Sequence, residues 1–248
     1  MIRLILCFFV LLIAFVLTVV AFPLSRLIRL INRRAGDLFS LRFVTTTFRA
    51  LLFVGGVHVE FIGKEHLPKK GEAVVYISNH LGVFDIVALY PEFPDLTGFV
   101  AKKEILSWPL IGWWLKAVNS LPLDRKDPRS GFRTIFKAAD YVEKEGISMV
   151  IFPEGTRSRK DGDVLPFHKG SFKLATTPKA RLIPVAITNT SAVFEDHLPF
   201  IRSQKVVIEF CEPIETADLT REEEKDLPVK VHDIIEERVR ANHPAVNK

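Results

Sequence analysis

Short apolar runs alternate with longer amphipathic segments along this chain, from residue 57 towards the C-terminal end. The runs with the length of β-strands are 57–62, 73–78, 97–101, 118–123, 148–152, 182–188 and 205–211. The segments with helical character lie near 85–91, 104–117, 129–145, 170–179 and 228–241. Strands that alternate with helices are typical of parallel sheets with crossover connections. The sequence therefore predicts an α/β domain over 57–248, with a largely parallel central sheet of about seven strands flanked by helices, although the last strands could pair antiparallel.

The N-terminal segment, residues 1–56, has a different composition. It contains 19 consecutive uncharged residues, from Leu4 to Phe22. As a helix rising about 1.5 Å per residue, this run would nearly cross a bilayer core of about 30 Å. A cleaved signal peptide is the alternative, but the run is longer than is usual for one, and Phe22-Pro23-Leu24 is a poor cleavage site. The run predicts a membrane helix, which either spans the bilayer or dips into one leaflet.

Arginine is concentrated in the same segment. Residues 1–56 hold seven of the 34 basic residues and one of the 29 acidic ones, so this segment has a net charge of +6 and the remainder −1. Beyond Pro23, the apolar residues of a helical wheel lie opposite Arg26, Arg29 and Arg33. This pattern predicts an amphipathic helix at an anionic membrane surface and not a nucleic-acid-binding segment. If the first helix spans the cell membrane, the arginines after it place the remaining domain on the cytoplasmic face.

A histidine and an aspartate follow the apolar run 73–78, at positions 80 and 85. On one continuous helix this spacing would turn the two side chains about 140° apart. If the run is a buried strand and Asp85 opens a helix, the turn between them can instead fold the imidazole back onto the carboxylate. Asp85 would then fix the tautomer of His80 and leave its other nitrogen as a general base. The alternative is that Asp85 only caps a helix and His80 is a loop residue.

Three further segments follow in order, each at an apolar run: Leu123-Asp124-Arg125, Phe152-Pro153-Glu154-Gly155-Thr156-Arg157-Ser158 and Leu182-Ile183-Pro184-Val185-Ala186-Ile187. Together with His80 and Asp85 they resemble the four ordered blocks of the glycerophospholipid acyltransferase family, which contains the 1-acyl-sn-glycerol-3-phosphate acyltransferases. The resemblance covers about residues 60–190. Asn119 departs from the pattern, because the second block of the family usually starts with Gly six residues before its Arg.

The resemblance implies an enzyme of phospholipid biosynthesis bound to a membrane. It would transfer an acyl chain from an acyl carrier protein or coenzyme A thioester to the free hydroxyl of lysophosphatidic acid, giving phosphatidic acid. His80 would remove the hydroxyl proton and Asp85 would orient the imidazole. The alkoxide would attack the thioester directly, without a covalent acyl-enzyme. The thioester is a co-substrate, and neither a cofactor nor a metal is implied.

The resemblance also implies which residues bind the acceptor. By carry-over, its phosphate would contact Arg125, Gly155, Thr156 and Arg157, and Glu154 would position the glycerol backbone. Arginine suits this task because guanidinium meets phosphate oxygens bidentately. Lys102 directly follows a predicted strand and could help to hold phosphate or be only a solvated charge. His168 is the competing general base, but the sequence places no carboxylate at a comparable spacing from it.

Other functions remain open from the sequence. The acceptor could be glycerol-3-phosphate or another lysophospholipid, the chain could be a lipid-binding protein without catalysis, or water could replace the hydroxyl in a lipid hydrolase. The paired His80 and Asp85 argue against a binding protein, and the phosphate-binding blocks argue against a hydrolase. The seven histidines lack metal-ligand spacing, no serine-esterase motif is present, and the two cysteines imply no disulfide framework.

Overall fold

The computed structural model describes residues 1–158 and 162–246, and its centre is a seven-stranded sheet. The strands are β1 (Val57–Ile62), β2 (Val75–Ser78), β3 (Thr97–Lys102), β4 (Leu121–Leu123), β5 (Ser148–Ile151), β6 (Leu182–Thr188) and β7 (Gln204–Phe210). Their order is β1-β7-β6-β2-β5-β3-β4, and only the β6–β7 pair is antiparallel. The prediction of a largely parallel sheet is confirmed, including the antiparallel pairing at the last strand.

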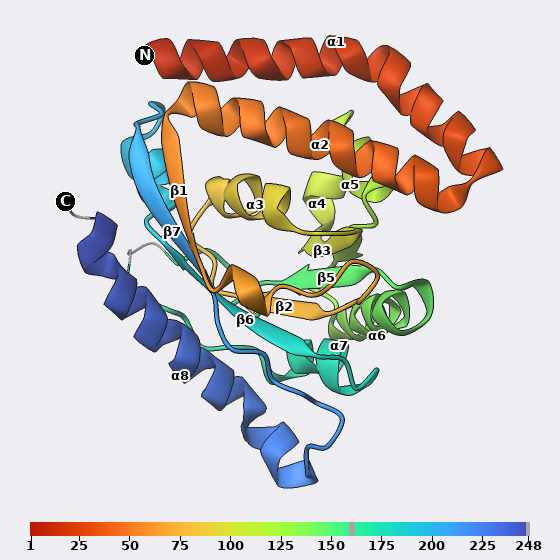
Figure 1. Cartoon of the computed structure of the whole chain (residues 1–248), viewed down its shortest axis with the longest axis vertical. Helices are drawn as coiled ribbons and strands as arrows, with labels where there is room; N and C mark the ends of the chain where they lie inside the picture. Colours follow the sequence, from red (N-terminus) through yellow and green to blue (C-terminus); the bar gives the residue numbers. More distant parts are fainter. Residues whose placement is uncertain (159–161, 247–248) are drawn as a thin grey trace.

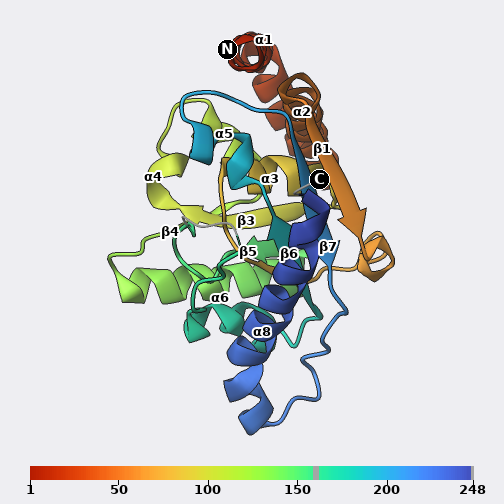
Figure 2. The same ribbon diagram turned by 90° about the vertical axis from the view of Figure 1, so that its left-hand side faces the viewer.

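Helices cover both faces of the sheet (Figures 1 and 2). One face carries α3 (Val83–Leu89), α4 (Lys103–Leu106) and α5 (Ile111–Ala117), and the other carries α6 (Pro128–Glu145), α7 (Lys173–Thr176) and α8 (Arg221–Val246). The single helix predicted over 104–117 is divided at Pro109, because proline provides no backbone N–H and Leu110 adopts a φ of 62°. The last helix begins earlier than predicted, with glutamates in its first turn, where they complement the helix dipole.

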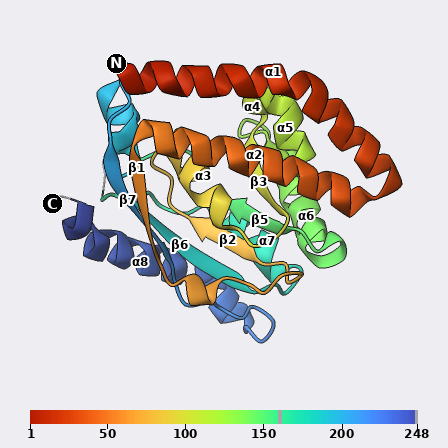
Figure 3. The ribbon, with the colours of Figure 1, turned by 45° about the horizontal axis from the view of Figure 1, so that its top comes forward.

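The two N-terminal helices form an antiparallel pair over α3–α5 (Figure 3). These helices, α1 (Ile2–Ile31) and α2 (Arg33–Gly55), are both long and apolar enough to cross a membrane. The helix α1 continues through Pro23 and bends towards its C-terminal end (Figure 1). Trp114 of α5 ties the pair to the rest of the protein, since its Nε1 donates to Thr18 Oγ1 at 2.9 Å and its ring stacks on Phe43.

The N-terminal arginines contact protein as well as facing outwards. Arg29 Nε lies 2.7 Å from the buried Asp37 Oδ1 of α2, and Arg33 pairs with Glu145 at the end of α6. The predicted polar face is therefore partly used to hold α1 against α2, through Arg29, and the start of α2 against α6, through Arg33. The helix α2 ends at Gly55 and β1 begins at Val57, and the division into two domains at residue 56 stays a prediction.

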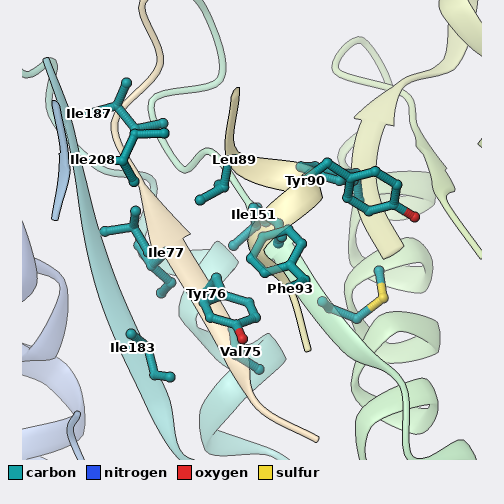
Figure 4. Close-up of a cluster of buried hydrophobic side chains, with 14 of the residues drawn as sticks. Val75, Tyr76, Ile77, Leu89, Tyr90, Phe93, Ile151, Ile183, Ile187 and Ile208 are labelled. Atoms are coloured by element: carbon teal, nitrogen blue, oxygen red, sulfur yellow. The ribbon is translucent and has the colours of Figure 1, made fainter. Parts of the chain in front are cut away.

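The core lies on both sides of β2, whose four residues are all buried. In Figure 4, Ile77 lies near Ile187 and Ile208, while Tyr76 faces Phe93 with ring centroids 4.6 Å apart. A strand covered on both faces has no solvent-facing positions, which explains the continuous apolar run in its sequence. This core fixes the ends of the parallel strands relative to one another, and those ends form the site described next.

Candidate active site

The turn after β2 brings His80 onto Asp85. Asn79 anchors this turn, because its Nδ2 donates to Ile187 O and its Oδ1 accepts from Ile187 N, both at 2.8 Å. Asp85 lies in the first turn of α3, and its Oδ2 is 2.6 Å from His80 Nδ1. The fold-back geometry predicted from the sequence is present, so Asp85 does more than cap a helix.

Asp85 is fully buried and surrounded by hydrogen-bond donors. Its Oδ2 also accepts from Leu81 N at 2.7 Å and Gly82 N at 2.9 Å, and Thr190 Oγ1 donates to its Oδ1. Four donors, counting His80 Nδ1, thus converge on the two oxygens of this carboxylate. With Nδ1 of His80 donating to Asp85, the Nε2 lone pair is available on the opposite side of the ring, which lines a cleft.

The cleft next to His80 has a volume of about 600 Å³. It lies at the carboxyl ends of the parallel strands, where ligands of open α/β sheets bind. Four of the predicted binding residues line it: Lys102, Arg125, Thr156 and Arg157. Apolar side chains form the rest of its wall, among them Ile86, Phe99, Ile105, Leu123 and Ile151. The cleft therefore joins the His80–Asp85 pair, two guanidinium groups and an apolar wall.

A tight turn leads into β4, and Arg125, the arginine of the second block, follows this strand and lines the cleft. Asn119, where the family usually has Gly, adopts a left-handed φ of 61°, which asparagine tolerates better than most residues. The turn is therefore present despite the departure from the pattern. Burial lowers the pKa of Arg125, and the nearby Arg157 acts in the same direction, while Glu104 raises it. Two guanidinium groups in the same cleft, those of Arg125 and Arg157, favour a ligand with more than one negative charge.

Glu154 is placed differently from the other predicted residues. It is 4% exposed, its Oε1 accepts from His80 N at 2.9 Å, and its Oε2 has no hydrogen-bond partner among the described residues. Burial raises the pKa of Glu154 to about 8. Its carboxyl group thus supports the backbone of His80 from behind the cleft, and the predicted contact with glycerol stays a prediction.

Gly155 and His168 meet beside the cleft rather than inside it. Gly155 has a φ of 69°, and a Cβ at this position would approach His168 Nε2 to 3.0 Å. Both residues line a neighbouring groove of about 350 Å³, which also contacts Arg125. The competing base His168 is therefore on the far side of the Gly155 turn, whereas His80 lines the cleft itself.

Two residues of the site had not been predicted from the sequence. Thr190 follows β6 and bonds to Asp85, and Glu195 lines the cleft opposite the third block. Glu195 Oε1 accepts from Val83 N at 2.7 Å and lies 3.4 Å from Arg157 Nη1. Burial raises the pKa of Glu195. The position of Thr190 after a parallel strand was a usable signal, but no local pattern marks Glu195.

No cluster of three or more His, Cys, Asp or Glu side chains within 1–158 and 162–246 could hold a metal ion. The chemistry that the described residues themselves offer is proton transfer at His80 and anion binding at the two arginines. Both are needed where a phosphorylated alcohol is acylated.

Comparison with known proteins shows the family of this chain. A family model described as Acyltransferase matches residues 58–188, so the chain belongs to this acyltransferase family. The matched residues run from β1 to the end of β6 and include every predicted site residue.

Among its relatives are proteins named 1-acyl-sn-glycerol-3-phosphate acyltransferase. The one from Limnanthes douglasii is 30% identical over 184 residues, which cover 74% of this chain and 64% of the relative. The one from Saccharomyces cerevisiae is 31% identical over 195 residues, covering 77% and 64% respectively. A relative from Haemophilus influenzae is 29% identical, with 69% of this chain and 70% of the relative covered. The chain thus spans slightly under two thirds of the first two relatives.

The fold is also similar to a crystal structure described as the 1-acyl-sn-glycerophosphate (LPA) acyltransferase, PlsC, from Thermotoga maritima. The two share a TM-score of 0.77 and 24% sequence identity, over 96% of this chain and 95% of that one. The similarity therefore extends over the N-terminal helices as well as the α/β domain.

Proposed function

We propose that this protein is a 1-acylglycerol-3-phosphate O-acyltransferase, which converts lysophosphatidic acid to phosphatidic acid. The observation that carries the proposal is the His80–Asp85 pair beside a cleft that also contains Arg125 and Arg157. The names of the relatives support the same acceptor. A simple lipid hydrolase would not require two guanidinium groups next to its base.

In the proposed reaction, the oxygen of the acceptor hydroxyl attacks the thioester carbonyl while His80 Nε2 takes the hydroxyl proton. The tetrahedral intermediate collapses with cleavage of the carbon–sulfur bond, and the imidazolium returns the proton to the thiolate. Asp85 holds the ring and stabilises the transient positive charge. Because the acceptor oxygen attacks the thioester directly, the reaction does not need an acyl-enzyme.

The acceptor phosphate would lie between Arg125 and Arg157, with the Thr156 hydroxyl as a further donor and Lys102 at the edge of the cleft. Charge-assisted, bidentate contacts of this kind position a phosphate as well as bind it. The Gly155 turn would present Thr156 and Arg157 to the ligand. The hydroxyl would then approach His80, and the acyl thioester, carried by acyl carrier protein or coenzyme A, would occupy the apolar side.

Membrane association is supported by the two N-terminal helices. Large apolar side chains are exposed along α1, and Arg26, Arg29 and Arg33 surround a hollow of about 470 Å³ near its C-terminal end. We place these helices in an anionic cell membrane with the catalytic domain on the cytoplasmic face. This location suits an acceptor that is itself a membrane amphiphile.

The test uses the full-length protein in lipid nanodiscs. It is offered lysophosphatidic acid, glycerol-3-phosphate and lysophosphatidylcholine with palmitoyl-carrier protein or palmitoyl-coenzyme A, and the lipid products are identified by mass spectrometry. The expected product is phosphatidic acid, with little turnover of the other acceptors and loss of turnover in His80→Ala. Preferential acylation of glycerol-3-phosphate or lysophosphatidylcholine would contradict the proposed acceptor. Release of free fatty acid without an acylated product would instead indicate a hydrolase.

A further inference from the structure

The helix α6 exposes two large aromatic side chains. Its residues Ile135 and Val142 are buried against the sheet, whereas Phe132 is 52% exposed and Phe136 is 48% exposed. These phenylalanines lie one helical turn apart and form a continuous apolar strip. Exposed aromatic groups of this size on a helix that already has a buried face indicate a contact site.

Exposed basic residues surround this strip. Arg129, Arg133 and Lys137 lie on the same side of α6 as Phe132 and Phe136, and these five residues are called the α6 face below. Two further exposed lysines flank the face, Lys126 before the helix and Lys169 next to Gly170, which lies against the Phe132 ring. The acids next to the start of α6 are engaged elsewhere, since Asp124 pairs with Lys103 and Asp127 caps the helix at Arg129 N. Further along the same side of the helix, the exposed Asp140 pairs with Lys144. Residues 129–137 therefore present an aromatic and positively charged face.

A groove connects the α6 face to the catalytic cleft. It has a volume of about 350 Å³, and its wall includes Phe132 at the surface and Phe152 inside. Leu123, Arg125, Ile151 and Phe152 line both the groove and the cleft. The ring of Phe152 stacks on that of His80, with centroids 4.4 Å apart. A flexible chain lying in this groove from the α6 face would thus end beside the general base.

We infer that the α6 face is the docking surface for the acyl donor and that this donor is a small acidic carrier protein. Its phosphopantetheine arm would occupy the groove and deliver the thioester to His80. This inference rests on the proposed function, because it assigns the donor of that same reaction. It also names Arg129, Phe132, Arg133, Phe136 and Lys137 as determinants of donor recognition.

The extent of the face favours a protein over coenzyme A. Arg129 and Lys137 are eight residues apart, which is about 12 Å along a helix, so one nucleotide would engage only part of the row. Arginine and exposed aromatic side chains are also the groups enriched at protein interfaces. In Figure 2, α6 lies on the opposite side of the sheet from α1 and α2, so these helices could be in a membrane while α6 faces the aqueous phase.

The experiment compares two charge-reversal variants of the full-length protein in nanodiscs. R129E/R133E changes the α6 face, and glutamate near a helix start is compatible with folding. The control K69E/K70E makes the same change in net charge at two exposed lysines before β2, at the amino end of this central strand and outside the α6 face. KM is measured for palmitoyl-carrier protein, palmitoyl-coenzyme A and lysophosphatidic acid. Binding of palmitoyl-carrier protein is measured separately by surface plasmon resonance at low and high salt.

We expect R129E/R133E to raise KM for palmitoyl-carrier protein by about tenfold or more, since opposed charges at an interface govern association. Its KM values for palmitoyl-coenzyme A and lysophosphatidic acid should stay near those of the parent, as should all three values in K69E/K70E. An equal rise for both thioesters would overturn the inference, because the arginines would then bind coenzyme A or the arm itself. No rise for either thioester would overturn it as well.

The binding measurement separates this inference from the proposed function. Salt-sensitive binding of palmitoyl-carrier protein to the parent and its loss in R129E/R133E would support docking even if phosphatidic acid were not the product. Binding that is absent in the parent, or unchanged in R129E/R133E, would overturn the inference even if the protein acylates lysophosphatidic acid from coenzyme A.

Discussion

Replacing Asp85 by asparagine isolates the electrostatic contribution of this carboxylate to the proposed reaction. The amide oxygen of the new side chain could still accept from His80 Nδ1 and from the backbone amides of Leu81 and Gly82, while its NH₂ group could donate to Thr190 Oγ1. The ring would keep its orientation and its tautomer. Only the negative charge next to the imidazolium of the transition state would be lost.

The expected loss follows from the distance between the charges. His80 Nδ1 and Asp85 Oδ2 are 2.6 Å apart. The centres of the delocalised charges on the imidazolium and the carboxylate are therefore separated by about 4 Å. At an effective dielectric constant of about 20, two unit charges at this separation attract each other by about 4 kcal/mol. If half to all of the charge has developed in the transition state, Asp85→Asn raises the barrier by about 2–4 kcal/mol, which lowers kcat ~30- to 1,000-fold.

The assay is steady-state formation of phosphatidic acid from lysophosphatidic acid and a saturating acyl thioester. Asp196→Asn is the matched control, because Asp196 lines the same cleft but bonds to Ser191 Oγ at 3.0 Å and not to His80. Its kcat should stay within about threefold of the parent. The reasoning would be refuted if the kcat of Asp85→Asn also stayed within about threefold of the parent. It would be refuted as well if Asp196→Asn lost as much kcat as Asp85→Asn.

Three further predictions concern Thr190, Arg157 and Glu154. Thr190→Val removes a donor to the buried Asp85, a contact worth about 1.5–3 kcal/mol, so kcat should fall about tenfold or more and recover in Thr190→Ser; failure of serine to rescue would indicate a packing role. Arg157→Ala should raise KM for lysophosphatidic acid more than KM for the thioester; the reverse would assign Arg157 to the donor. Burial raises the pKa of Glu154 to about 8, so the folded protein keeps a proton that the unfolded chain releases at lower pH. The parent should therefore lose thermal stability relative to Glu154→Gln between about pH 4.5 and pH 8, and a constant difference in Tm across this range would contradict the raised pKa.

Much of this protein can be derived from local sequence patterns. A strand buried on both faces needs an uninterrupted apolar run, as at Val75–Ser78, and an apolar stripe such as that around Ile135 marks a helix packed on a sheet. His80 and Asp85 could be paired in advance because a strand, a short turn and a helix start leave few ways for the chain to fold. Arg125 and Arg157 each follow a parallel strand, so their place at the carboxyl ends of the strands also follows from the local pattern.

The contacts that complete the site depend on the tertiary structure. Thr190 is 105 residues from Asp85, and Glu195 is 38 residues from Arg157, so no periodicity or spacing connects either pair. These pairs meet because the packed core fixes β6 next to β2 and brings the loop after β6 over the cleft. The same packing buries Glu154 behind His80, although its sequence block associated it with the ligand. Local patterns determine which strands and turns form, but the burial and partners of each polar side chain depend on segments far away in the chain, and only the assembled core decides them.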